Sequence, residues 1–125
     1  MVKGIGVDII EIERIDRSIR NLGDRFVRKI FTDREIAYCS AKPTAAQHYA
    51  ARFAAKEALS KALSTGWAGE FRWKDVEITN EFSGQPRIEL HGTMKDMLLD
   101  CSILVSLSHS TSHVVAMVVI EGSAA

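Results

Sequence analysis

Two carboxylates and two lysines in this sequence are of the types that bind a metal ion and a phosphate group. Asp8 lies in the apolar stretch GIGVDIIEI, and Glu57 lies with Lys56 and Lys61 in FAAKEALSKAL. An ionised carboxylate among isoleucines and valines is costly unless it is paired, hydrogen-bonded or bound to a metal. Mg²⁺ takes one or two protein carboxylates together with waters and substrate phosphates, and adjacent lysines could hold a pyrophosphate. These residues indicate a phosphate-binding metal site if the fold brings Asp8 and Glu57 together.

The same residues also have a purely structural interpretation. Asp8 could cap a neighbouring loop or pair with an arginine. Glu57 and Lys61 are four residues apart, so on a helix they could form an exposed ion pair worth about 0.3–0.5 kcal/mol. Phe53 lies one turn before Glu57 on the same side of that helix and suggests that something covers this face. The residues alone leave both interpretations open.

The stretch around Asp8 is predicted to be a strand over residues 2–11. Strand alternation places Gly4, Gly6 and Asp8 on one face, with isoleucine and valine side chains on the other. The absence of side chains at Gly4 and Gly6 is expected to leave room beside the carboxylate.

The stretch around Glu57 is predicted to be part of a long helix over residues 44–66, ending at Gly66 as helices often do. On a helical wheel at about 100° per residue, one stripe is apolar and forms the expected core face. It contains Ala51, Ala55, Ala58, Leu59, Ala62 and Leu63. The other side contains Arg52, Lys56, Glu57, Ser60, Lys61 and Ser64. The polar side is therefore the expected functional face.

The remaining segments predict an α+β domain. Helical spacing covers residues 12–30 with a break at residues 21–23, and a capping box of Thr32 and Glu35 begins a short helix that stops near Pro43. Strands are expected at 71–79, 86–90, 102–108 and 113–121, with a helix at 91–100. We therefore expect one domain over residues 1–125, in which the long helix packs on a mainly antiparallel sheet.

The composition excludes several classes of partner. Sixteen basic residues balance sixteen acidic ones, so no overall charge favours nucleic acid or a membrane surface. The apolar run at 114–120 is too short to span a bilayer, and the start of the chain does not resemble a signal peptide. Cys39 and Cys101 lack metal-ligand spacing, so they are expected to be reduced thiols of a cytoplasmic protein.

Four segments in this order resemble the holo-acyl-carrier-protein synthases, the small class of 4′-phosphopantetheinyl transferases. These segments are GIGVDIIEIERI, FAAKEALSKAL, the turn GQP and the tip SLSH, and the resemblance covers the whole chain. It implies the 4′-phosphopantetheinyl transferase fold. It also implies a reaction that supports fatty acid biosynthesis. Phosphopantetheine from coenzyme A is attached to a serine of an apo acyl carrier protein, leaving adenosine 3′,5′-bisphosphate.

The resemblance also implies roles for individual residues. Asp8 and Glu57 would bind Mg²⁺ on the CoA pyrophosphate, with the glycines making room, and Lys61 would stabilise or protonate the leaving phosphate. The base that takes the serine proton is Glu57 or a water held by Asp8 or Glu57. The other implied CoA contacts are Arg52 and Lys56 at the phosphates, Gly84, Gln85 and Pro86 at the adenine, and Ser108 and His109 at the 3′-phosphate.

The implied macromolecular partners are the carrier protein and further copies of the chain. Carrier proteins are acidic along the helix after their serine, and Arg14, Arg25, Phe26 and Lys29 are the expected docking residues. Enzymes of this class assemble as homotrimers with active sites between subunits. The metal site and the Ser108/His109 tip would then come from neighbouring chains, and a neighbour would also explain Phe53.

Two other functions remain open. The first is another Mg²⁺-dependent nucleotide phosphotransferase or pyrophosphatase that uses the same carboxylates without a macromolecular acceptor. The second is a non-catalytic domain whose basic helices bind an acidic partner.

Overall fold

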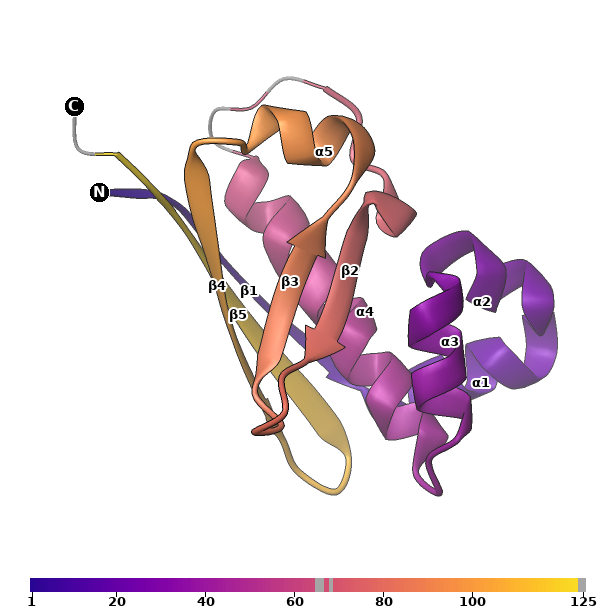
Figure 1. Cartoon of the computed structure of the whole chain (residues 1–125). Coiled ribbons are helices and arrows are strands. Elements are labelled where there is room, and N and C mark those ends of the chain that lie inside the picture. The colour runs from indigo at the N-terminus through magenta and orange to yellow at the C-terminus, as the bar shows by residue number, and fades with distance from the viewer. Residues whose placement is uncertain (65–66, 68, 124–125) are drawn as a thin grey trace.

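The computed structural model of the chain describes residues 1–64, 67 and 69–123 (Figure 1). Its elements follow one another along the chain as predicted, with a short 3₁₀ helix added before the second strand. They are β1 (Val2–Glu11), α1 (Ile12–Leu22), α2 (Asp24–Ile30), α3 (Asp33–Ser40), α4 (Ala45–Leu63), η1 (Trp73–Asp75), β2 (Val76–Asn80), β3 (Pro86–Leu90), α5 (Gly92–Met97), β4 (Cys101–His109) and β5 (His113–Gly122). The predicted helix end at Gly66 lies outside the described residues.

The strands form two antiparallel sheets. One has the order β1-β5-β4, and the other consists of the β2-β3 hairpin. Helix α4 crosses the inner face of the three-stranded sheet, while α1, α2 and α3 gather at the far end of the molecule from α5 (Figure 1). The prediction of an α+β fold with a long helix on a mainly antiparallel sheet is confirmed.

The two glycines of β1 allow α4 to lie directly on the strand. A Cβ at Gly6 would be 1.9 Å from the carbonyl oxygen of Ala58, and a Cβ at Gly4 would be 2.3 Å from that of Ala62. The expectation that the glycines leave room for a metal and its phosphates is therefore wrong, because the helix backbone fills that space. The glycines instead bring α4 close enough for its side chains to reach Asp8.

Gly6→Ala is expected to lower the free energy of unfolding by about 2–4 kcal/mol, because the new methyl group overlaps helix backbone that cannot move aside. Urea unfolding would measure the loss. Thr93→Ala, at an exposed position of α5, is the comparison and should leave the free energy of unfolding nearly unchanged. A Gly6→Ala protein as stable as the wild type would contradict the close packing of β1 and α4.

Local signals fixed several boundaries and misplaced others. The break predicted within residues 12–30 is confirmed at Gly23, whose φ of 57° separates α1 from α2. The Thr32–Glu35 capping box is confirmed with both of its hydrogen bonds. The strand predicted at 71–79 begins only at Val76, because η1 precedes it, and α5 is shorter than predicted.

Helix α4 is enclosed on more sides than its sequence pattern suggests. Ala55, Ala58 and Leu59 lie in the core as predicted. Arg52 and Lys56, predicted on the exposed polar side, are only 3% and 0% exposed. The prediction of one exposed face is wrong for these two residues, since α3 and β2 contact α4 as well as the sheet. Among the described helices, none is both long and apolar enough to cross a membrane.

Phe53 is covered by the chain itself. Its ring stacks on Trp73 of η1 with centroids 5.3 Å apart, and it also lies 6.3 Å from the ring of Phe26 in α2. The expectation that something covers this side of the helix is confirmed, but the cover is η1 and α2. A neighbouring chain is not needed to explain Phe53.

Candidate active site

Asp8, Glu57 and Lys61 converge where β1 passes under α4. Asp8 is on the face of β1 that faces the helix, and its side chain is 14% exposed. The Lys61 ammonium donates to Asp8 Oδ1 at 3.0 Å and to the Val7 carbonyl oxygen at 3.1 Å. Glu57 lies one helical turn before Lys61, on the same side of α4. The structure thus brings together the three residues that the sequence singled out for metal and phosphate binding.

The charge of Asp8 acts on Glu57. Burial raises the pKa of Glu57 above its ordinary value, and the negative charge of Asp8 raises it further. The positive charges of Lys61 and Arg14 lower the pKa of Glu57, so both cations lie near its carboxylate. The position of Arg14, at the start of α1, adds a second cation to this group.

This group of side chains fits a hard divalent cation. It offers only carboxylate oxygens as charged ligands, and Mg²⁺ prefers oxygen ligands and commonly takes one or two carboxylates. A cation between Asp8 and Glu57 would relieve the repulsion that raises the pKa of Glu57. The donor set therefore matches the metal that the sequence predicts.

A second group of predicted residues gathers near the first half of α4. The Arg52 guanidinium donates to Asn80 Oδ1 at 2.7 Å, and the Asn80 amide donates to the Gly84 carbonyl oxygen at 3.0 Å. The guanidinium carbon lies 4.3 Å from the centre of the Tyr38 ring. Asn80 therefore connects Arg52 to the turn that contains Gly84.

Positive charge accumulates around Arg52. Burial lowers the pKa of His48, and the nearby charges of Arg52, Lys42 and His109 lower it further. His109, at the end of β4, thus lies near the first turns of α4 within the same chain. These four residues, Lys42, His48, Arg52 and His109, form what we call the basic cluster. The charges of Arg52 and Lys42 make it a suitable place for an anion.

Ser108 is not part of the basic cluster. It pairs with Val115 and lies on the outer face of the sheet, whereas His109 pairs with Val114 and lies on the inner face. The two residues predicted to bind the 3′-phosphate together therefore point to opposite sides of β4.

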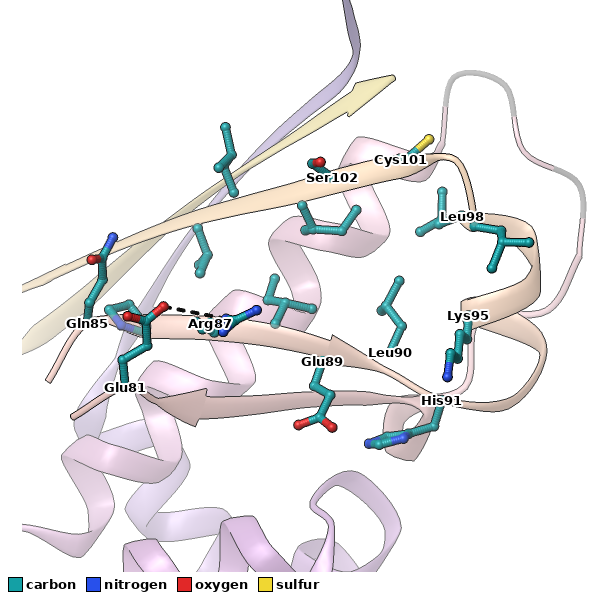
Figure 2. Close-up of a pocket in the computed structure, with 16 residues that line it drawn as sticks. Glu81, Gln85, Arg87, Glu89, Leu90, His91, Lys95, Leu98, Cys101 and Ser102 are labelled. Atoms are coloured by element: carbon teal, nitrogen blue, oxygen red, sulfur yellow. Dashed lines mark ion pairs between the residues drawn. The ribbon is translucent and has the colours of Figure 1, made fainter. Parts of the chain in front are cut away.

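Gln85 and Pro86 lie at one end of a long groove between β3 and β4. The groove has a volume of about 990 Å³ and extends to Leu98 and Cys101 at the α5 end (Figure 2). Its lining comes from the turn, β3, α5 and β4, so it does not coincide with the group formed by Asp8, Glu57 and Lys61. The chain therefore presents the turn and the metal-binding candidates on separate surfaces.

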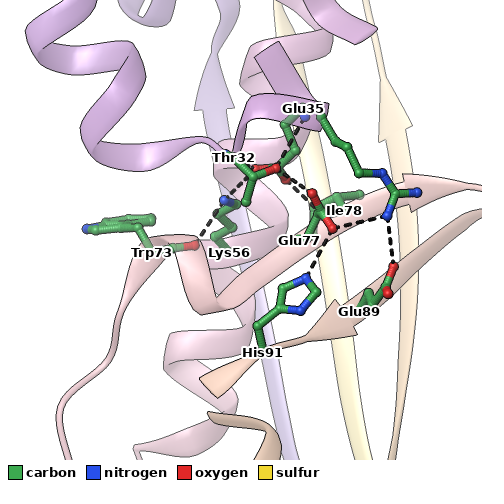
Figure 3. Close-up of polar contacts among 9 residues, drawn as sticks. Thr32, Glu35, Lys56, Trp73, Glu77, Ile78, Glu89 and His91 are labelled. Carbon is green, nitrogen blue, oxygen red and sulfur yellow. Dashed lines mark hydrogen bonds and ion pairs between the residues drawn. The ribbon is translucent and has the colours of Figure 1, made fainter. Parts of the chain in front are cut away.

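Lys56 has a structural position. Its ammonium donates to Glu35 Oε1 at 2.7 Å and to the carbonyl oxygens of Ile30 and Trp73 at 2.7 and 3.0 Å. Figure 3 draws the contacts of Lys56 with Glu35 and Trp73. All three protons are used, and neither Lys56 nor the Glu35 side chain is exposed. Burial lowers the pKa of Lys56, and Glu35 opposes that effect. We therefore correct the prediction of Lys56 as a CoA phosphate contact.

Glu35 is part of a larger polar network that includes residues of α3, β2 and β3. Its second oxygen accepts from the Ile78 N–H at 2.8 Å, which joins α3 to β2 (Figure 3). Glu77, Glu89 and His91 place one ligand atom each within 4.8 Å of one another. The Arg34 guanidinium already lies 3.4 Å from both carboxylates, so this cluster is an ion-pair network.

The charge of Glu77 in this network makes the free energy of unfolding depend on pH in the acid range. Burial raises the pKa of Glu77, but hydrogen bonds from Thr32 and His91 and the charge of Arg34 outweigh it, so its net pKa lies below the ordinary 4.5. Because the folded-state pKa is the lower one, the stabilisation is present above pH 4.5 and is lost as pH falls through the folded pKa.

We expect Glu77→Gln to have a lower free energy of unfolding than wild type at neutral pH. The difference in free energy between the two proteins should become smaller below pH 4.5. Urea unfolding at several pH values would measure it. The matched control is Glu121→Gln, at an exposed position of β5. A difference that stays constant through this range would contradict the assigned role of Glu77.

The predicted docking residues form a mostly exposed basic surface on α1 and α2. Arg14, Arg25 and Lys29 are exposed. Phe26 is half-buried and packs against Phe31 and Phe53, with ring centroids 6.2 and 6.3 Å away. The three cations are therefore accessible to a partner, while Phe26 mainly holds α2 on the core.

Sequence reasoning missed Asn80, Tyr38 and His48. A usable signal existed for Asn80, because asparagine at the end of a strand often bonds to the backbone of the following turn. Tyr38 and His48 gave no such signal, since only the packing of α3 beside α4 places them near Arg52.

Comparison with known proteins identifies relatives over nearly the whole chain. Residues 4–118 match the family model described as the 4′-phosphopantetheinyl transferase superfamily. A holo-[acyl-carrier-protein] synthase of Geobacter sulfurreducens is 42% identical over 124 residues, covering 97% of this chain and 98% of the relative. The crystal structure of the Neisseria meningitidis synthase has a TM-score of 0.88 at 31% identity, covering 97% of this chain and 99% of that one. The Bacillus anthracis synthase, solved in complex with CoA (3′,5′-ADP), has a TM-score of 0.81 at 35% identity, with 98% and 99% covered.

Proposed function

Because the chain belongs to the holo-acyl-carrier-protein synthases of the 4′-phosphopantetheinyl transferase superfamily, we propose that it transfers 4′-phosphopantetheine from coenzyme A to a serine of an apo acyl carrier protein. The products are the holo carrier protein and adenosine 3′,5′-bisphosphate. The whole chain, residues 1–125, acts as one catalytic domain, and its physiological role is in fatty acid biosynthesis. Its two free cysteines, Cys39 and Cys101, are compatible with action in the cytoplasm.

The observation that carries the proposal is the convergence of Asp8, Glu57 and Lys61. Asp8 and Glu57 would hold Mg²⁺, which when bound supplies charge neutralisation on the pyrophosphate as a Lewis acid. Lys61 is placed to contact a phosphate oxygen beside these carboxylates and to stabilise the charge that develops on the leaving group. Glu57 either takes the serine proton itself or holds a water that does so.

The basic cluster is the proposed site for the nucleotide end of CoA. Arg52 and His109 would contact its 3′-phosphate, and Gly84, Gln85 and Pro86 would lie against the adenine. The link from Arg52 through Asn80 to Gly84 supports this assignment, because it holds the cation and the turn in one fixed arrangement. Ser108 lies on the outer face of the sheet, so it would contact a 3′-phosphate that is bound on that face.

The metal group (Asp8, Glu57 and Lys61) and the basic cluster around Arg52 lie on different sides of α4, which supports an assembly in which subunits share active sites. Arg52 and Glu57 are five residues apart on α4, which turns their side chains about 140° away from each other. One CoA molecule is therefore better placed between the metal group of one chain and the basic cluster of another. The outer face of the sheet is apolar and available for such contact, with Ile5, Val7 and Ile9 each more than half exposed. We propose a homotrimer.

The carrier protein would dock on the basic surface formed by Arg14, Arg25 and Lys29, with the partly exposed edge of Phe26 as a smaller contact. Arg14 lies near Glu57, so a carrier bound to α1 would bring its serine toward the metal group. Such contacts act mainly on the association rate and weaken as salt is added.

The test is the intact mass of an apo acyl carrier protein after incubation with this protein, CoA and Mg²⁺. The proposal predicts a gain of one phosphopantetheine that is abolished by a chelator. No gain with carriers of both fatty-acid and polyketide type would overturn it. Cleavage of CoA without modification of the carrier would instead identify a pyrophosphatase.

A further inference from the structure

The ammonium of Lys61 contacts Asp8, one of the two carboxylates that would hold a metal ion. Its 3.0 Å contact with Asp8 Oδ1 and its 3.1 Å contact with the Val7 carbonyl oxygen hold it over β1. Asp8 is mostly buried, so few other directions of approach to its carboxylate are open. Lys61 therefore serves as the counter-ion of Asp8 in the metal-free protein.

The same ammonium also acts on Glu57. Glu57 and Lys61 are four residues apart on α4, so their side chains are neighbours on one side of the helix, and the ammonium that contacts Asp8 is also next to Glu57. A dication placed between Asp8 and Glu57 would seek the same oxygens and would be repelled by the ammonium. Metal and ammonium therefore compete for one pair of carboxylates.

The ammonium of Lys61 is free to move away from Asp8. Its side chain is 53% exposed, and lysine carries its charge on a flexible four-carbon stem with rotatable donors. An ammonium that is displaced from Asp8 remains tethered one turn from Glu57, where an incoming phosphate would lie next to it.

We propose that Lys61 is an exchangeable counter-ion. It neutralises Asp8 until a divalent cation displaces it, and the displaced ammonium then becomes the ligand of the substrate pyrophosphate. Metal binding and the orientation of the phosphate-binding lysine are thereby coupled. The second half of this exchange rests on the proposed transferase function, whereas the first half is a property of Asp8, Glu57 and Lys61 alone.

The test measures Mn²⁺ binding in the absence of CoA, from the electron paramagnetic resonance signal of the free ion. Lys61→Met is expected to bind Mn²⁺ about tenfold more tightly than wild type, and to lose transfer activity. Lys61→Arg keeps the charge and should bind Mn²⁺ about as wild type does. Lys74→Met, at an exposed position of η1, controls for the change in net charge. Thermal unfolding would establish that every variant is folded.

The direction of the change in Mn²⁺ affinity decides the result. Unchanged or weaker binding by Lys61→Met, or an absence of Mn²⁺ binding by every variant, would overturn the inference. Tighter binding together with a wild-type protein that modifies no carrier would support the exchange of counter-ions and defeat only the proposed function.

Discussion

Lys56→Met is expected to lower the free energy of unfolding by about 3–5 kcal/mol, since it leaves the Glu35 carboxylate buried without its cation. The carbonyl oxygens of Ile30 and Trp73 would lose the same donor. Methionine matches the length of the lysine stem, so the loss reports the missing charge and hydrogen bonds. Urea unfolding at neutral pH would measure it.

Two further variants make this prediction specific. Lys56→Met combined with Glu35→Gln removes both charges, and the glutamine oxygen can still accept from one of the two N–H groups, Thr32 or Ile78, that bond to Glu35. The double variant should therefore be more stable than the sum of the single losses predicts, by about 1–3 kcal/mol. Lys74→Met should stay within about 0.5 kcal/mol of wild type. A Lys56→Met protein as stable as Lys74→Met would show that the buried pair does not stabilise the fold.

The position of Lys56 explains why sequence patterns misplace it. A helical wheel assumes one buried stripe and one solvated face, but α4 contacts β1 and β5 on one side and α3 and β2 on another. Its partner Glu35 is 21 residues away in another helix. Nothing local reveals that a lysine in the middle of a helix will meet a buried carboxylate.

Local signals were sufficient where the physical cause is itself local. The Thr32–Glu35 capping box requires only a helix start, and the structure forms both of its hydrogen bonds. Gly23 was predicted at a helix break, and its positive φ is a conformation that glycine adopts easily. Strand alternation also correctly placed Asp8 on the same face of β1 as Gly4 and Gly6.

The glycines of β1 show where local reasoning reaches its limit. Alternation predicts that Gly4 and Gly6 share a face with Asp8, but it does not say what occupies the space above them. The structure fills it with the backbone of α4, at Ala58 and Ala62. The sequence therefore predicted which face of β1 Asp8 shares with the glycines but misread the reason for those glycines, since a metal and a helix backbone both require a missing side chain.

Glu57→Gln is expected to lower kcat/KM for carrier modification by at least about 10³-fold, equivalent to about 4 kcal/mol of transition-state stabilisation. Glutamine has nearly the same shape but supplies no negative charge to the metal. Folding should not suffer, because the charge of Glu57 is disfavoured by burial and by Asp8 in the metal-free protein. The variant should therefore be at least as stable as wild type while it loses activity.

A loss of activity without a loss of stability distinguishes a functional carboxylate from a structural one. A residue retained for the fold loses stability when it is neutralised, whereas one retained for a ligand does not. Initial rates of carrier modification over a range of Mg²⁺ concentrations would measure the activity, and chelator-treated protein would be used for unfolding. Glu13→Gln, on the exposed surface of α1, is the matched control and should retain full activity. If Glu57→Gln modified the carrier at the wild-type rate, Glu57 would not be a metal ligand, and its approach to Asp8 would need another explanation.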